Sequence, residues 1–218
     1  MRTFLMIGTS IFALGIGSAM AAPTITLDDS GENNSTQIIQ SADDTDSAIS
    51  VIQSGDGDGA LDIGSAVGGL NVYVEQTVTE DSTVHVEQHD TGDLGGGNSA
   101  SVMQSVSEAS SINVMQDGSE NRALVNQMGE EQTASVEQTG EGNTAEVWQN
   151  AEANMGTIIQ TGEDNTATLN QNGEGSIAML TQNGEENVAM VEQNSLEEGA
   201  MVTVNQTGDN GNANIVQN

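Results

Sequence analysis

Glutamine recurs along the chain at the end of short segments in which apolar and polar residues alternate. Two positions before each of these glutamines the residue is Val, Ile or Leu, and four positions before it the residue is apolar or glycine, with Thr36 as the exception. A period of two over about seven residues predicts a β-strand with one buried face. The glutamines in this register are Gln40, Gln53, Gln76, Gln88, Gln104, Gln116, Gln127, Gln138, Gln149, Gln160, Gln171, Gln182, Gln193, Gln206 and Gln217.

The segments between these strands carry turn signals. From Gln116 to Gln193 the glutamines are 11 residues apart, and six positions before each one stands mostly Asn or Ser. Four residues such as Thr139–Gly142 follow the glutamine, and glycine in such a segment can adopt positive φ. Each unit is therefore predicted to be one strand and one turn.

The number of units predicts the architecture. A gap of about two units separates Gln53 from Gln76, and Leu61, Ile63 and Ser65 fit the slots of a degraded unit there. Sixteen units folded face to face in pairs predict an all-β, amyloid-like cross-β fold. We expect a β-solenoid of about eight stacked 22-residue strand-turn-strand coils, roughly 38 Å long at 4.7–4.8 Å per coil. It would span residues 34–218, irregular over 34–115 and regular over 116–218.

Polar residues in a buried slot require partners. Inward-facing Asn and Gln are costly when unpaired, but stacked on equivalents in the next coil they can form hydrogen-bonded ladders. The predicted ladder residues are Gln116, Gln127, Gln138, Gln149, Gln160, Gln171, Gln182, Gln193, Asn121, Asn143, Asn154, Asn165 and Asn187.

The start of the chain is typical of a secretory signal peptide. Residues 1–21 hold Arg2, an apolar run and small residues before a cleavage site after Ala21 or Ala22. The alternative is a membrane anchor, but the apolar run is shorter than the roughly 20 residues that a span needs. We therefore expect a secreted protein, with residues 22–33 as an N-terminal segment before the repeats.

Composition narrows the possible functions. The chain has 33 acidic and 2 basic residues, a formal charge of −31, and no cysteine. This charge argues against nucleic acid and against an anionic membrane surface, and membrane insertion is not expected. No nucleophile and base are paired as in a catalytic site, so we expect neither an enzyme nor a bound cofactor.

Three further features have weaker functional interpretations. His85, Glu87 and His89 alternate and could bind zinc or copper, but strand decoration is favoured, with His89 in a turn. The segment Asp56–Asp62 resembles a single calcium-binding nonapeptide, although such sites need tandem copies. Tyr73 and Trp148 are predicted to be isolated aromatics on the outer surface.

The repeat Gln-x-Gly-x-x-Asn-x-Ala-x-x-x-Gln is similar to that of the curlins, the bacterial functional amyloid subunits. Gln138–Gln149, Gln160–Gln171 and Gln182–Gln193 match it fully, and Gln127–Gln138 departs only at Gln132. The resemblance implies an extracellular, pilus-like curli fibre subunit for adhesion and biofilm. It also implies partners: further copies of the chain, a nucleator subunit and an outer-membrane export pore. Residues 22–33 stand where the family's export-targeting segment lies.

Two alternatives to the major fibre subunit remain open. The chain could be a fibre nucleator or minor subunit, or a monomeric repeat adhesin whose acidic turns hold Ca²⁺. The last unit reaches Asn218 without a polar cap, so open strand edges are expected to template further copies. Acidic residues gather in the turns, and we hypothesise that their repulsion delays stacking until acid, salt or Ca²⁺ reduces it.

Overall fold

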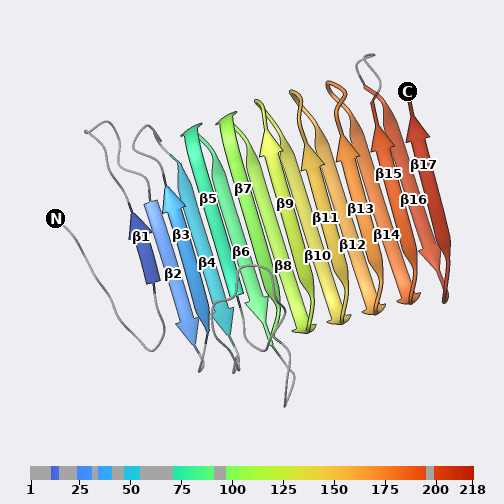
Figure 1. Ribbon diagram of the computed structural model, residues 1–218, viewed down its shortest axis with the longest axis horizontal. Helices are drawn as coiled ribbons and strands as arrows, with labels where there is room; N and C mark the ends of the chain where they lie inside the picture. The colour runs from blue at the N-terminus through green and yellow to red at the C-terminus, as the bar shows by residue number, and fades with distance from the viewer. Residues whose placement is uncertain are drawn as a thin grey trace.

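The computed structural model describes residues 11–14, 24–30, 34–40, 47–54, 71–90, 97–194 and 199–218. These residues form two parallel β-sheets that lie face to face, and the strands of one sheet run opposite to those of the other (Figure 1). The nine-stranded sheet holds β1 (Ile11–Leu14), β3 (Ser35–Gln40), β5 (Asn71–Glu80), β7 (Ser99–Glu108), β9 (Arg122–Met128), β11 (Thr144–Gln149), β13 (Thr166–Gln171), β15 (Val188–Gln193) and β17 (Asn212–Gln217). The eight-stranded sheet holds β2 (Thr24–Ser30), β4 (Ala48–Ser54), β6 (Thr83–His89), β8 (Ser111–Ser119), β10 (Thr133–Glu141), β12 (Met155–Glu163), β14 (Ile177–Glu185) and β16 (Met201–Thr207).

Each strand pairs with the strand two places along the chain, and like residues stack on like. Between β10 and β12, Val136 is paired with Ile158, Gln138 with Gln160 and Gly140 with Gly162. The chain therefore alternates between the two sheets and advances by one strand spacing per coil. This confirms the predicted all-β solenoid of stacked strand-turn-strand coils.

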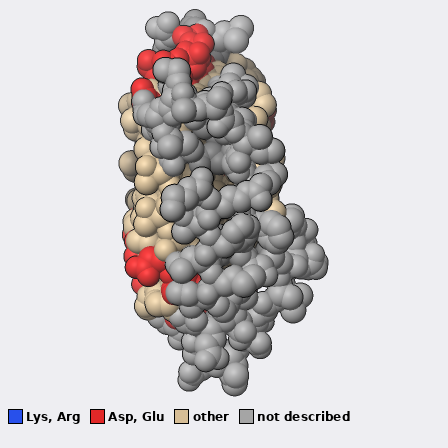
Figure 2. Space-filling view, turned by 90° about the vertical axis from the view of Figure 1, so that its left-hand side faces the viewer, with Lys and Arg blue, Asp and Glu red and all other residues tan. Residues whose placement is uncertain are grey.

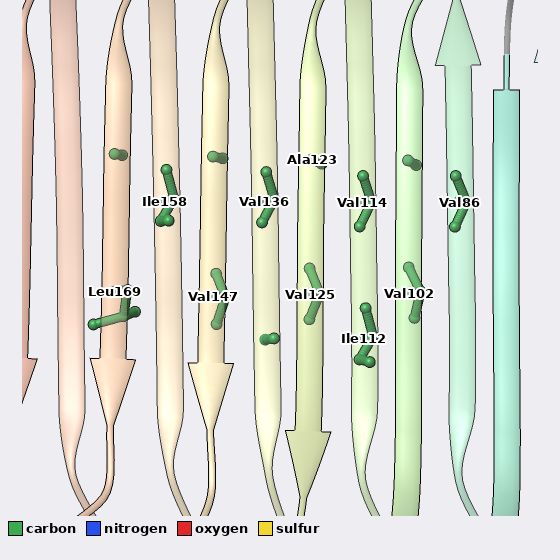
Figure 3. Close-up of a cluster of buried hydrophobic side chains, with 14 of the residues drawn as sticks. Val86, Val102, Ile112, Val114, Ala123, Val125, Val136, Val147, Ile158 and Leu169 are labelled. Atoms are coloured by element: carbon green, nitrogen blue, oxygen red, sulfur yellow. The ribbon is translucent and has the colours of Figure 1, made fainter. Parts of the chain in front are cut away.

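The core is a thin layer of small and aliphatic side chains between the sheets. In Figure 3, Ala123 lies close to the height of Val114 and Val136 of the facing sheet, so a small residue of one sheet faces larger residues of the other. Because opposed strands reverse direction, this exchange follows from the Ala-x-Val order within each strand. Gly156 shows the same complementarity, since a Cβ there would approach Leu169 Cδ2 to 2.8 Å. The largest fully buried side chains among the described residues are accordingly Ile, Leu and Gln.

The two kinds of turn differ, which the repeat had not indicated. β10, β12 and β14 continue past the glutamine through Gly-Glu, and these residues pair in register from coil to coil. β11, β13 and β15 instead end at the glutamine. Gly140, Gly162 and Gly184 have positive φ of 116°, 118° and 133°, and a Cβ on Gly162 would collide with the carbonyl of Gly184. Glycine is therefore required here both by its φ and by the close approach of the next coil.

The beginning of the stack differs from the prediction. Residues 24–30, expected to precede the repeats, form β2, in which Asp29 pairs with Gln53 of β4. The predicted start of the solenoid at residue 34 is therefore too late. β1 falls within the predicted signal peptide and pairs with β3.

The predicted unit at Leu61, Ile63 and Ser65 lies outside the described residues. β5 pairs with β3 and β4 pairs with β6, so β5 lies in the sheet opposite to the one that a unit between β4 and β5 implied. Residues 55–70, including the calcium-like Asp56–Asp62, lie outside the described residues. β2 to β17 give eight strands in each sheet.

Replacing Gly162 with alanine tests the stacking of the turns. Gly162→Ala forces alanine to positive φ and drives its Cβ into the next coil, whereas Gly208→Ala at φ 104° has nothing within 4 Å of the added atom. We expect both variants to lose about 1–3 kcal/mol from the φ cost, and Gly162→Ala to lose clearly more. Urea unfolding of freshly desalted chains, followed by far-ultraviolet circular dichroism, measures the difference. Equal unfolding midpoints would contradict close turn stacking.

Candidate functional site

Two glutamine ladders run through the core, one along each sheet. The predicted residues divide equally between them: Gln116, Gln138, Gln160 and Gln182 lie in the eight-stranded sheet, and Gln127, Gln149, Gln171 and Gln193 in the nine-stranded sheet. All eight are no more than 2% exposed. Each Nε2 donates to Oε1 of the next glutamine in its sheet, for example over 2.8 Å from Gln138 to Gln160 and 2.9 Å from Gln160 to Gln182.

The ladders also join the two sheets. The Nε2 of Gln160 donates to the carbonyl of Thr144 at 2.9 Å, and that of Gln182 to the carbonyl of Thr166 at 3.0 Å. Thr144 and Thr166 begin strands of the opposite sheet, so one amide holds both the next coil and the facing sheet. Because both amide protons of each glutamine are hydrogen-bonded, the cost of burying this polar side chain in the core is offset.

A third ladder, of asparagines, lines the corner before β9, β11, β13 and β15. Asn143 Nδ2 donates to Asn121 Oδ1 at 3.0 Å, and Asn165 and Asn187 repeat the contact at the same distance. Each Nδ2 also donates to a turn glycine of the next coil, as from Asn143 to the carbonyl of Gly162 at 2.9 Å. The ladder therefore fixes the glycine turns on which the strands stack.

Asn154 does not belong to that ladder, although the sequence grouped it there. It lies before β12 at the opposite corner, where its Oδ1 accepts from the backbone N–H of Ser176 at 2.9 Å. Gln132, the departure from the repeat, lies at the same corner and donates to the carbonyl of Ala151. This corner therefore carries a mixture of Gln132, Asn154 and Ser176 in place of an asparagine ladder.

Sequence reasoning missed one ladder on the surface. Asn150 donates to Asn172 and Asn172 to Asn194, both at 2.8 Å, and these side chains are exposed. They directly follow Gln149, Gln171 and Gln193, so an asparagine after alternate glutamines was the available signal.

Carboxylates form columns along the outer surface. Glu141, Glu163 and Glu185 are paired in register across β10, β12 and β14. In the view from the N-terminal end, acidic side chains are visible and no described Lys or Arg is seen (Figure 2). The stack therefore brings like charges within one strand spacing of each other.

The structure does not gather the weak metal candidates into one site. His85 Nε2 lies 3.7 Å from Glu87 Oε2, whereas His89 Nδ1 lies 3.3 Å from Asp117 of β8. His89 is the last residue of β6 and not a turn residue as expected. Within the described ranges no group of three or more His, Cys, Asp or Glu side chains could hold a metal ion.

The single aromatics have structural surroundings. Tyr73 lies half-buried on β5 and donates to Glu75 Oε2 at 2.6 Å; burial and this carboxylate raise the pKa of Tyr73 to about 12. Trp148 lies half-buried on the outer side of β11, at a position that alternates with the core residues. Tyr73 and Trp148 lie on different strands and do not form a common binding site.

A shallow hollow lies on the surface. Met128, Gly129, Asn150, Ala151, Glu152 and Glu174 line it at the turns between the sheets. Across the described ranges, no helix has the length and apolar character required to traverse a lipid bilayer. The arrangement is suited to stacking further strands, and the ladders and their ends are therefore the candidate functional site.

Gln160→Leu tests whether the ladder stabilises the fold. It leaves the buried Oε1 of Gln182 and the carbonyl of Thr144 without their donors, and each buried unsatisfied group costs about 1–3 kcal/mol. We expect a loss of roughly 2 kcal/mol or more in the free energy of unfolding by urea. Thr161→Leu, an exposed neighbour on the same strand, is the control and should change it little. Similar losses for both variants would argue against the ladder.

Comparison with known proteins agrees with this geometry. The curlin associated repeat matches residues 108–140 and 140–173, which cover β8 to β13 completely. No curated protein matches the chain. The in-register glutamines continue on both sides of the matched residues, from Gln53 to Gln217. Residues 108–173 are therefore curlin associated repeats, and the strands on either side continue the same glutamine register.

Proposed function

We propose that the protein is a structural subunit of an extracellular, curli-like amyloid fibre that grows by adding copies end to end. The observation that carries the proposal is the open edge at the end of the stack. β16 and β17 are the last strands of their sheets, and no further strand of the described residues pairs with them. Such edges present unpaired backbone groups that another chain can extend.

The core at this end supports the same proposal. Val202 and Val204 are 8% and 6% exposed, while Val136 and Val147 in the interior are 0% exposed. Ile215 and Gln217, which occupy core slots of β17, are only half-buried. A further coil would bury this apolar surface and continue both ladders.

The biological setting follows from the family resemblance. We propose that residues 1–21 direct export, that an outer-membrane curli pore releases the chain, and that a nucleator subunit starts the fibre. Adhesion and biofilm formation would then be properties of the fibre surface. The role is structural and not enzymatic, in keeping with the curlin repeat.

Incubation of the purified mature chain, residues 22–218, tests fibre formation. We expect fibres that resist SDS, diffract at about 4.7–4.8 Å along the axis, and grow without a lag from preformed seeds. Electron microscopy, fibre diffraction and thioflavin fluorescence measure these properties. A stable monomer that folds only with Ca²⁺ would instead favour the adhesin, and rapid growth without seeds would favour a nucleator.

The carboxylate columns predict that assembly depends on charge. Each like-charged pair one strand apart costs on the order of 1 kcal/mol in unscreened water and less in salt. We expect a shorter lag at pH 4, at high salt or with Ca²⁺ than in dilute neutral buffer. The triple variant Glu141→Gln, Glu163→Gln, Glu185→Gln should shorten the lag at neutral pH and respond less to salt. An unchanged lag in every condition would rule out control by charge.

A further inference from the structure

The glutamine ladder of the eight-stranded sheet has a direction. Gln88 donates to Gln116 at 2.7 Å and Gln116 to Gln138 at 2.8 Å, and each later Nε2 donates toward the C-terminal end in the same way. An end of such a ladder is therefore either a donor end or an acceptor end. In this sheet Gln206 occupies the last glutamine slot and Asp29 occupies the first. One end can therefore donate a hydrogen bond and the other can accept one.

The C-terminal end is a donor. Gln206 Oε1 accepts from Gln182 at 2.9 Å, and Gln206 Nε2 donates to the carbonyl of Val188 at 3.1 Å. Each interior glutamine makes these contacts and also donates to the next coil. The second N–H of Gln206 is the one that would continue the ladder, and its side chain is half-buried at the edge.

The N-terminal end is an acceptor. Asp29 pairs in register with Gln53 and so occupies the glutamine slot of β2. Its carboxylate is half-buried and accepts from Asn34 Nδ2 at 2.6 Å. Gln53 Oε1 accepts from the hydroxyl of Thr36, so the ladder requires no donor from Asp29. An ionised carboxylate accepts only and keeps further lone pairs for another donor.

We propose that copies of the chain join head to tail through a hydrogen bond from Gln206 of one copy to the Asp29 carboxylate of the next. This inference rests on the proposed function, because it specifies the seam of the fibre. Continuing the β14–β16 register onto β2 places Val202 opposite Ile25 and Val204 opposite Leu27. Ile25 is 40% exposed at the open end, so the seam also buries apolar surface.

The same residues disfavour the other ways of joining two ends. Two C-terminal ends would bring donor against donor, and two N-terminal ends would bring the Asp29 carboxylates together. A head-to-tail contact is heterologous and does not close, so it produces a filament with two different ends. In the mature chain β1 is absent together with the predicted leader, and β3 becomes the edge strand beside β2.

Two substitutions at Asp29 change the net charge equally but differ in whether a hydrogen-bond acceptor remains. Asp29→Leu removes the acceptor, whereas Asp29→Gln restores the residue of the interior ladder. Asp28→Leu makes the same change on the exposed outer side of β2. With the mature chain and wild-type seeds, we expect Asp29→Leu to raise the residual soluble concentration about tenfold, equivalent to about 1.4 kcal/mol. Asp29→Gln and Asp28→Leu should remain within about threefold of wild type.

A second measurement does not depend on fibres of the variant. Asp29→Leu chains retain Gln206 and should add once to the N-terminal end of a wild-type fibre, where they present Leu and stop growth. Small amounts added to labelled wild-type seeds are therefore expected to block one end, as seen by single-fibre fluorescence microscopy. Growth that continues at both ends, or stops at both, would overturn the proposed seam.

The outcomes distinguish this seam from the proposed function. Wild-type fibres together with equal behaviour of Asp29→Leu and Asp29→Gln would overturn the Gln206–Asp29 bond and leave the fibre subunit intact. An equal loss in both Asp29 variants would also overturn it. Absence of fibres from the wild-type chain would instead reject the proposed function itself.

Discussion

The structure depends on hydrogen bonds between identical amide side chains one strand spacing apart. Each core glutamine donates along the axis to the next coil and across the core to the facing sheet, as Gln160 does to Gln182 and Thr144. Because an unpaired amide would be costly in this interior, the bonds hold every strand in one register. The glycine turns, the asparagine corner and the pairing of small with large aliphatic residues all require that register.

A fold made of stacked equivalent coils has two distinct ends and a very thin interior. Its core is only as thick as two facing side chains, such as Ala123 opposite Val136 (Figure 3). The repeating surface carries columns of like charge, which oppose the stacking that the core favours. The protein therefore combines hydrogen bonding and apolar packing inside with repulsion between carboxylates outside.

Much of the architecture and of the site could be predicted because both are periodic. The aliphatic residue two places before each glutamine identified the buried face, and the 11-residue spacing identified the strands from β8 to β15. The prediction failed where the period fails. Counting a unit between Gln53 and Gln76 assigned β5 to the wrong sheet, and Asp29 occupies a glutamine slot that no repeat signal marked.

By itself, the sequence determined the strand period, the buried set of residues and the coil of two strands, because a side chain's alternation along a strand is local. Only the tertiary structure decided which sheet each strand joins, which corner Asn154 occupies and in which direction the amides donate. These features depend on contacts between residues that are 22 or more positions apart in the chain. A single irregular segment therefore changes the sheet to which every earlier strand is assigned. The polarity of the ladder, and with it the difference between the two ends, exists only once the coils are stacked.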